Sequence, residues 1–185
     1  MQVLQTIQAP LASAILALSL AFACPARAAD DISLADLKAA TRTLGFLQNT
    51  SRAKEFVIGI VYVAGSANGK SLGQQTVERI RSLPGPNDTS LKAELIATSD
   101  LASHVDRLDA LYLVPGTAGV GAGIVDMARR RHLLIMSNDP GCLDQHCCML
   151  VVRDTGRVEI TMDSALAQSA GVTFSSVFAM MVKHR

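Results

Sequence analysis

Residues 110–136 read ALYLVPGTAGVGAGIVDMARRRHLLIM, and this stretch decides the fold. Ala110–Val114 and His132–Met136 are largely apolar runs of the kind that forms strands covered on both faces. Between them, a glycine-rich turn leads into a helical pattern over Gly119–Arg130. A strand, a helix and a second strand in this order predict two parallel strands joined by a right-handed crossover. We therefore expect a parallel sheet at the centre of the protein.

The same alternation continues on both sides of this unit. Upstream, the patterns predict helix, strand, helix, strand and a short capped helix, in the order Ile32–Leu47, Phe56–Val63, Gly69–Leu83, Lys92–Thr98 and Ser99 or Asp100 to Val105. Downstream, they predict a hairpin and two helices, in the order Cys148–Arg153, Val158–Met162, Asp163–Ala170 and Ser175–Lys183. The expected fold class is a single α/β domain, with a mostly parallel sheet flanked by helices and an antiparallel C-terminal hairpin.

The first 28 residues have the pattern of a cleaved secretory signal. Leu11–Cys24 is an apolar run, and Ala26 and Ala28 provide the small side chains that signal peptidase reads. As a helix, the fourteen residues of this run would rise about 21 Å, which is too short for a hydrocarbon core of ~30 Å. We expect cleavage after Ala28, a folded domain over residues 29–185, and a periplasmic location.

Composition argues against several classes of function. Lys and Arg number 17 against 16 Asp and Glu, no Trp is present, and aromatic residues make up 4% of the chain, so neither a basic stripe nor a base-stacking platform is expected. No apolar run after the leader is long enough to span a bilayer. We therefore expect no nucleic-acid partner and no membrane insertion.

The sequence offers no catalytic constellation. Neither a G-x-S-x-G elbow nor an H-E-x-x-H pair is present. Residues 64–71, AGSANGKS, lie between a strand and a helix, but Ala64 stands where a phosphate-binding loop needs glycine. We expect a protein that is not an enzyme and that uses no cofactor.

The glycine-rich turn is a candidate ligand site. Pro115–Gly123 follows a predicted strand, and open α/β sheets bind ligands at the carboxyl ends of their strands. Its glycines do not follow the G-x-G-x-x-G spacing of dinucleotide-binding turns, so ordinary loop glycines remain the alternative. The residues that would form a small-ligand or anion site are Gly116, Gly119, Gly121 and Gly123.

Three cysteines lie close together after the fourth predicted strand. In an oxidising compartment, Cys142 is expected to pair with Cys147 or Cys148, which leaves one thiol unpaired. A metal site of these three cysteines and His146 is the alternative, because thiolate and imidazole are soft ligands. Neighbouring cysteines on an extended chain point to opposite faces, which disfavours a shared ion. The disulfide is the preferred interpretation.

The last fifty residues resemble the YfiR/HmsC family of periplasmic proteins. The resemblance is carried by the strand at 132–139, the Gly141-Cys142 loop, the cysteine before Met149-Leu-Val-Val, Gly156-Arg-Val-Glu-Ile, the helix at 163–172 and Phe174-Ser-Ser-Val-Phe-Ala-Met-Met. The chain departs from the family in lacking a second cysteine pair, in its doubled Cys147-Cys148, and in Met162, where the family has Asn.

The resemblance implies a repressor. Such proteins bind the periplasmic domain of an inner-membrane diguanylate cyclase, hold it inactive, and lower cyclic-di-GMP signalling and biofilm formation. It also implies that the loop disulfide joins Cys142 to Cys148, with Cys147 as the alternative partner. A different hypothesis is a periplasmic small-ligand-binding component of an uptake or sensing system. A homodimer is compatible with either.

Overall fold

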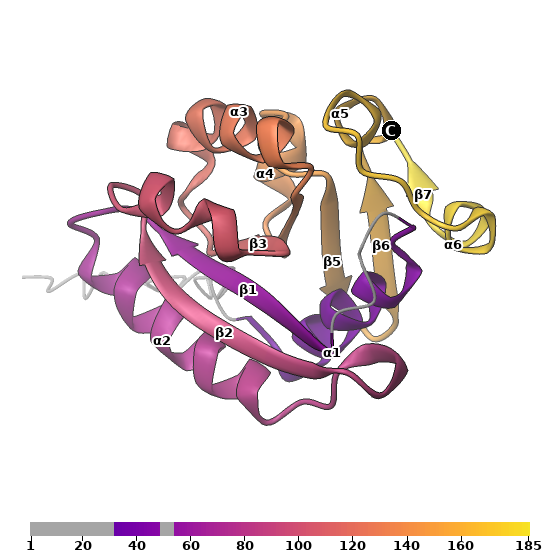
Figure 1. Ribbon diagram of the computed structural model, residues 1–185, viewed down its shortest axis with the longest axis horizontal. Coiled ribbons are helices and arrows are strands. Elements are labelled where there is room, and N and C mark those ends of the chain that lie inside the picture. The colour runs from indigo at the N-terminus through magenta and orange to yellow at the C-terminus, as the bar shows by residue number, and fades with distance from the viewer. Residues whose placement is uncertain (1–31, 49–53) are drawn as a thin grey trace, which may run out of the picture.

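The apolar runs predicted as strands lie together in one sheet. In the computed structural model, which describes residues 32–48 and 54–185, seven strands form a single twisted sheet in the order β2-β1-β3-β4-β5-β6-β7 (Figure 1). The strand bounds are β1 Glu55–Tyr62, β2 Ser90–Ala97, β3 Ala110–Leu113, β4 Leu134–Ser137, β5 Leu150–Asp154, β6 Val158–Met162 and β7 Lys183–His184. The predicted leader, residues 1–28, lies outside the described residues.

The strand pairing confirms the expected fold class. β1 pairs in parallel with both β2 and β3, and the parallel series continues through β4 to β5. β5 and β6 form the predicted antiparallel hairpin, and the unpredicted β7 adds in parallel to β6. β3 and β4 are buried along their whole length, as their apolar sequences require.

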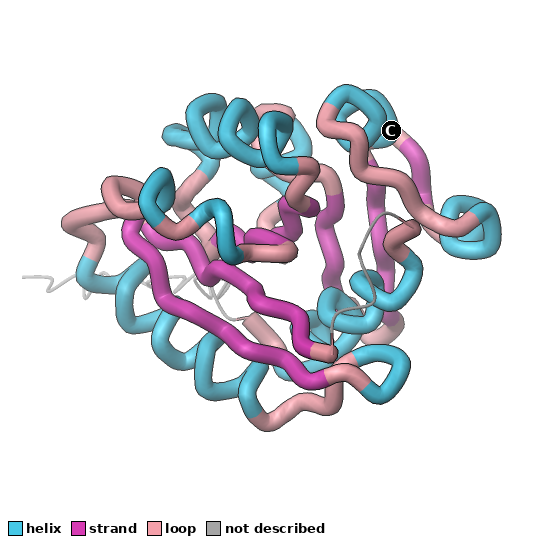
Figure 2. The backbone as a smooth tube through the Cα atoms, in the orientation of Figure 1, coloured by secondary structure: helices cyan, strands magenta, loops and turns pink. Residues whose placement is uncertain are grey.

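Helices cover both faces of the sheet (Figure 2). α1 (Leu34–Thr43) and α2 (Ala67–Arg81) lie on one side, and α3 (Gly121–Arg131) and α4 (Pro140–Asp144) lie on the other (Figure 1). α5 (Ser164–Ser169) and α6 (Ser176–Met181) lie beside the hairpin end of the sheet. Short 3₁₀ turns occupy Leu44–Phe46, Pro86–Asp88, Leu101–Ser103, Val105–Arg107 and Ala118–Val120.

Local capping explains where several helices begin. The predicted cap of the first helix is confirmed, because Ser33 and Asp36 form a reciprocal capping box. The single short helix expected after Ser99 or Asp100 is instead two 3₁₀ turns without a side-chain cap. α4 was not predicted, although Asp139 accepts a hydrogen bond from the Gly141 N–H and Pro140 occupies its first turn.

None of the helices in the described part of the chain combines the length and the apolar character that a membrane crossing needs.

Tyr112 is the one large polar side chain at the centre of β3. Its side chain is 1% exposed, and its hydroxyl has no hydrogen-bond partner within residues 32–48 and 54–185. Burial raises the pKa of the Tyr112 phenol, and the charges of Asp36 and Cys148 act in the same direction. A buried hydroxyl without a partner loses its hydration on folding and gains no bond in return.

Tyr112→Phe is therefore expected to stabilise the protein. Removing the unpaired hydroxyl should raise the free energy of unfolding by about 1 kcal/mol, or the melting temperature by roughly 2–4 °C for a chain of this size. Thermal unfolding measures the effect, with the partly exposed Tyr62→Phe as a near-neutral control. A clear loss of stability in Tyr112→Phe would show that the hydroxyl has a partner.

Candidate functional site

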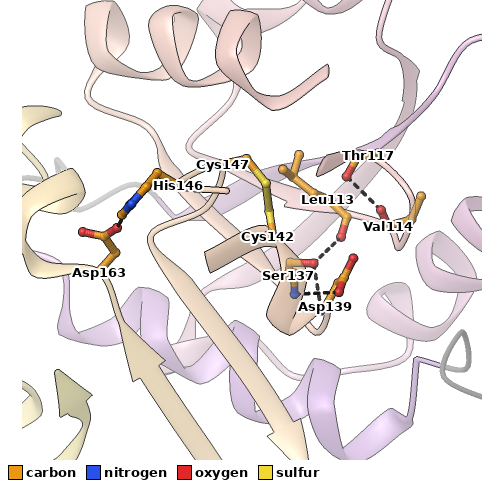
Figure 3. The surroundings of a disulfide bond; sticks show 10 residues. Leu113, Val114, Thr117, Ser137, Asp139, Cys142, His146, Cys147 and Asp163 are labelled. Atoms are coloured by element: carbon orange, nitrogen blue, oxygen red, sulfur yellow. Dashed lines mark hydrogen bonds and ion pairs between the residues drawn. A yellow bond between two sulfur atoms is a disulfide. The ribbon is translucent and has the colours of Figure 1, made fainter. Parts of the chain in front are cut away.

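The carboxyl ends of β3 and β4 lie beside the cysteine loop. Figure 3 shows the disulfide beside Leu113 and Ser137, the last residues of these strands. The Ser137 hydroxyl donates to the Leu113 carbonyl over 2.9 Å, and the Thr117 hydroxyl donates to the Val114 carbonyl over 2.9 Å. Both hydroxyl groups therefore donate their protons to backbone carbonyl oxygens.

The disulfide joins Cys142 to Cys147. After α4, His146 takes a left-handed conformation (φ 51°), and the Cys147 N–H donates to the Cys142 carbonyl over 2.8 Å. This turn brings the two Cα atoms to 5.0 Å, within the usual range for a disulfide. The pairing of Cys142 with Cys148, implied by the family resemblance, is therefore wrong here, and the alternative partner Cys147 forms the bond.

Cys148 is a buried free thiol beside this disulfide. Burial raises the pKa of the Cys148 thiol, and the negative charges of Asp139 and Asp163 raise it further. The sulfur atoms of all three cysteines lie within 4.8 Å of one another. The expectation that the neighbouring cysteines would diverge is wrong, because the chain turns at His146 and becomes a strand only at Leu150.

The four candidate ligand glycines have different surroundings. A Cβ at Gly121 would overlap the side chain of Cys147, whereas a Cβ at Gly119 or Gly123 would meet nothing among the described atoms within 4 Å. Gly116 has φ +90°, a left-handed conformation that favours glycine. Gly121 is therefore a packing position between α3 and the disulfide, and the other three line open space.

A contact between His146 and Asp163 connects the cysteine loop to the residue that follows β6. His146 Nδ1 lies 2.8 Å from Asp163 Oδ2, and the other carboxylate oxygen accepts from the Leu166 N–H at the start of α5. Burial acts to raise the pKa of the Asp163 carboxyl, but the hydrogen bonds of Leu166 and His146 outweigh it and hold the pKa below its ordinary value. No local sequence pattern predicts this pair, because 17 residues separate its members.

A second feature, the α1–α6 groove, lies on the α1 side of the hairpin. It has a volume of about 290 Å³ and is lined by Ala39, Arg42, Thr43, Phe46, Val158, Ile160, Phe178, Met181 and Val182. The ring of Phe178 stacks on Phe46 with centroids 5.1 Å apart and contacts Phe174 at 4.8 Å. Phe178 is 2% exposed, so these rings give the groove a firmly packed apolar wall.

Large apolar side chains remain exposed along this groove. Met181 and Val158, which line it, are 64% and 50% exposed, and Val177 and Met180 on α6 are 56% and 79% exposed. The sequence predicted the apolar helix but not its exposure. In the sequence, this helix is an apolar segment without a polar face. Such a pattern fits either a buried helix or an exposed helix that binds a partner.

Comparison with known proteins identifies the fold. No protein-family model matches the sequence, and a search of curated proteins finds no relative. A conserved domain protein from Vibrio cholerae O1 biovar El Tor is similar in structure, with a TM-score of 0.56, 12% identity, and coverage of 83% of this chain and 60% of that chain. The ligand-free, open structure of CD0873, a substrate-binding protein with adhesive properties from Clostridium difficile, is similar with a TM-score of 0.53, 13% identity, and coverage of 70% and 54%.

This chain thus spans little more than half of the length of the second protein and 60% of the first. At such identities the likeness shows a shared α/β fold.

Gly121→Ala is expected to destabilise the protein. Its Cβ would overlap Cys147, and overpacking of this kind costs about 1–3 kcal/mol. Gly123→Ala is the matched control in the same helix, because its Cβ meets open space and alanine favours the helix. Chemical denaturation of both variants measures the difference. Equal stabilities would contradict the contact between α3 and the cysteine loop.

Cys142→Ser is expected to lower the melting temperature of the oxidised protein. The disulfide closes a loop with a sequence separation of five, so its loss should cost about 2 kcal/mol, or roughly 4–8 °C. Reduced wild-type protein should melt near the variant. A wild-type melting curve that is the same under oxidising and reducing conditions would count against a stabilising role for this bond.

Proposed function

We propose that this protein is an exported binding protein that holds a partner protein in the α1–α6 groove. The observation that carries the proposal is the exposure of Val158 and Met181, which both line an apolar groove. Contiguous exposed apolar surface of this kind marks interaction sites in soluble domains. The disulfide of the cysteine loop fits an oxidising compartment outside the cytoplasm.

The groove favours an apolar segment that also carries an acidic residue. Methionine side chains on α6 can adapt to the shape of a partner. Arg42 lines the groove, and no carboxylate in the described part of the chain pairs with it. Nearby Glu159 is already held by Arg157 at 2.9 Å and by Lys183 at 3.2 Å. A partner carboxylate would therefore find Arg42 available beside the apolar contact.

The proposed partner is the periplasmic domain of an inner-membrane diguanylate cyclase. Support for this comes from the resemblance to the YfiR/HmsC family, which is carried by the cysteine loop, the hairpin and the last helix. The same hairpin and helix build the α1–α6 groove. Binding would hold the cyclase inactive, lower cyclic-di-GMP and reduce biofilm formation.

A small-ligand receptor is the second candidate. It is favoured by the structural likeness to CD0873 and by the open space around Gly119 and Gly123 at the carboxyl edge of the sheet. A ligand that binds only the folded state raises the melting temperature by an amount that grows with its concentration relative to Kd. A thermal-shift screen of small periplasmic solutes would therefore distinguish the candidates, since the receptor hypothesis requires a concentration-dependent shift that Gly123→Leu removes.

Met181→Glu is expected to weaken partner binding at least about tenfold, because it places a charge in an apolar contact. Val120→Glu is the matched control, since Val120 is also an exposed apolar residue (42%) but does not line the groove. Titration of the purified cyclase periplasmic domain measures both affinities, and cellular cyclic-di-GMP should rise with Met181→Glu alone. Unchanged binding by Met181→Glu, or no binding by the wild type, would contradict the proposal.

A further inference from the structure

We propose that Cys142, Cys147 and Cys148 form a binding site for a soft monovalent cation, Cu(I), once the disulfide between the first two is reduced. This site is separate from the α1–α6 groove and does not depend on the partner proposed for that groove. Thiolate sulfur is the ligand type that selects Cu(I).

The sulfur geometry fits a single ion. All three sulfur atoms lie within 4.8 Å of one another. Three sulfurs bonded to one ion at about 2.3 Å in a trigonal plane lie about 4.0 Å from one another. A pair of sulfurs at the 4.8 Å limit therefore has to approach by about 0.8 Å. The Cys142 and Cys147 sulfurs have to move apart to the same spacing once the disulfide is reduced, and side-chain rotation provides movements of this size.

Backbone contacts hold this arrangement independently of the disulfide. The Cys147 N–H donates to the Cys142 carbonyl over 2.8 Å, and the His146 N–H donates to the Leu143 carbonyl over 3.0 Å. On the other side, the Met149 N–H donates to the Ile135 carbonyl of β4 over 2.9 Å, which fixes the chain just after Cys148. Reduction breaks the sulfur–sulfur bond and leaves these hydrogen bonds in place.

The number and type of ligands favour Cu(I) over Zn²⁺. Structural zinc sites are almost always four-coordinate, whereas in the described part of the chain the cluster contains three sulfurs and no further ligand. The nearby His146 ring instead contacts Asp163 through Nδ1. Each cysteine is at most 1% exposed, so the site offers no water-filled fourth position.

The disulfide has to be reduced before all three cysteines can bind one ion. A dithiol reductant transfers two electrons and two protons to the Cys142–Cys147 bond and becomes a disulfide itself. Each thiol that then binds Cu(I) releases its proton to solvent. In the oxidised protein, Cys148 is the one free thiol of the three, so this form cannot provide three thiolate ligands to one ion.

The test compares oxidised and reduced protein under anaerobic conditions. Residues 29–185 are reduced with dithiothreitol, desalted, and titrated with Cu(I) against a coloured Cu(I) chelator. Reduced wild type should retain one Cu(I) per chain and the oxidised protein none. Cys148→Ser in the reduced state should bind at least about tenfold more weakly. Retention no greater than that of a Cys142→Ser/Cys147→Ser/Cys148→Ser variant would overturn the proposal.

Two further measurements keep the test independent of variant folding. X-ray absorption of the wild-type complex should count three sulfur ligands, and a count of two would contradict the three-cysteine site. Alkylation of wild type in urea-free buffer should slow at all three cysteines when Cu(I) is bound. Unchanged alkylation at Cys148 would likewise contradict its role as the third ligand. Circular dichroism checks that Cys148→Ser retains the sheet.

Discussion

The close approach of Gly121 to Cys147 is the contact on which the arrangement at the carboxyl edge depends. It packs the first turn of α3 directly on the disulfide, with no room for a side chain between them. The strand–helix–strand unit of residues 110–136 and the loop that follows β4 are thus held in one position relative to each other. Because interiors are close-packed, the first turn of α3 and the Cys147 side chain leave no room for either to move towards the other.

Periodicity was sufficient to predict most of the fold. Apolar runs such as Phe56–Val63 can be buried only between two helical layers, so they specify a parallel sheet with little ambiguity. α4 and β7 escaped prediction because each is too short for a periodic pattern: α4 depends on an Asp139 cap, and β7 forms where Val182 becomes extended after α6. Their formation is decided by local caps and neighbours rather than by hydrophobic spacing.

The candidate sites were harder to predict than the fold, for different reasons. The cysteine cluster was visible in sequence, but the choice between Cys147 and Cys148 depends on one left-handed residue, His146, which is neither Gly nor Asn. The α1–α6 groove joins residues from positions 39 to 182, and no local pattern reveals that Val158 and Met181 stay exposed. The exposure of these two side chains depends on how distant elements pack, and the spacing of apolar residues along the sequence carries no information on that packing.

The two edges of the sheet are unequal, and this limits how other chains can add to it. β2 offers a ladder of eight residues, whereas β7, two residues long, carries Lys183 and His184. Short, charged edge strands resist pairing with a further strand. The groove lies beside β6 at the β7 end, so a partner bound there is held by side-chain contacts. Addition of a further β-strand through backbone hydrogen bonds is favoured at the other edge of the sheet, along β2.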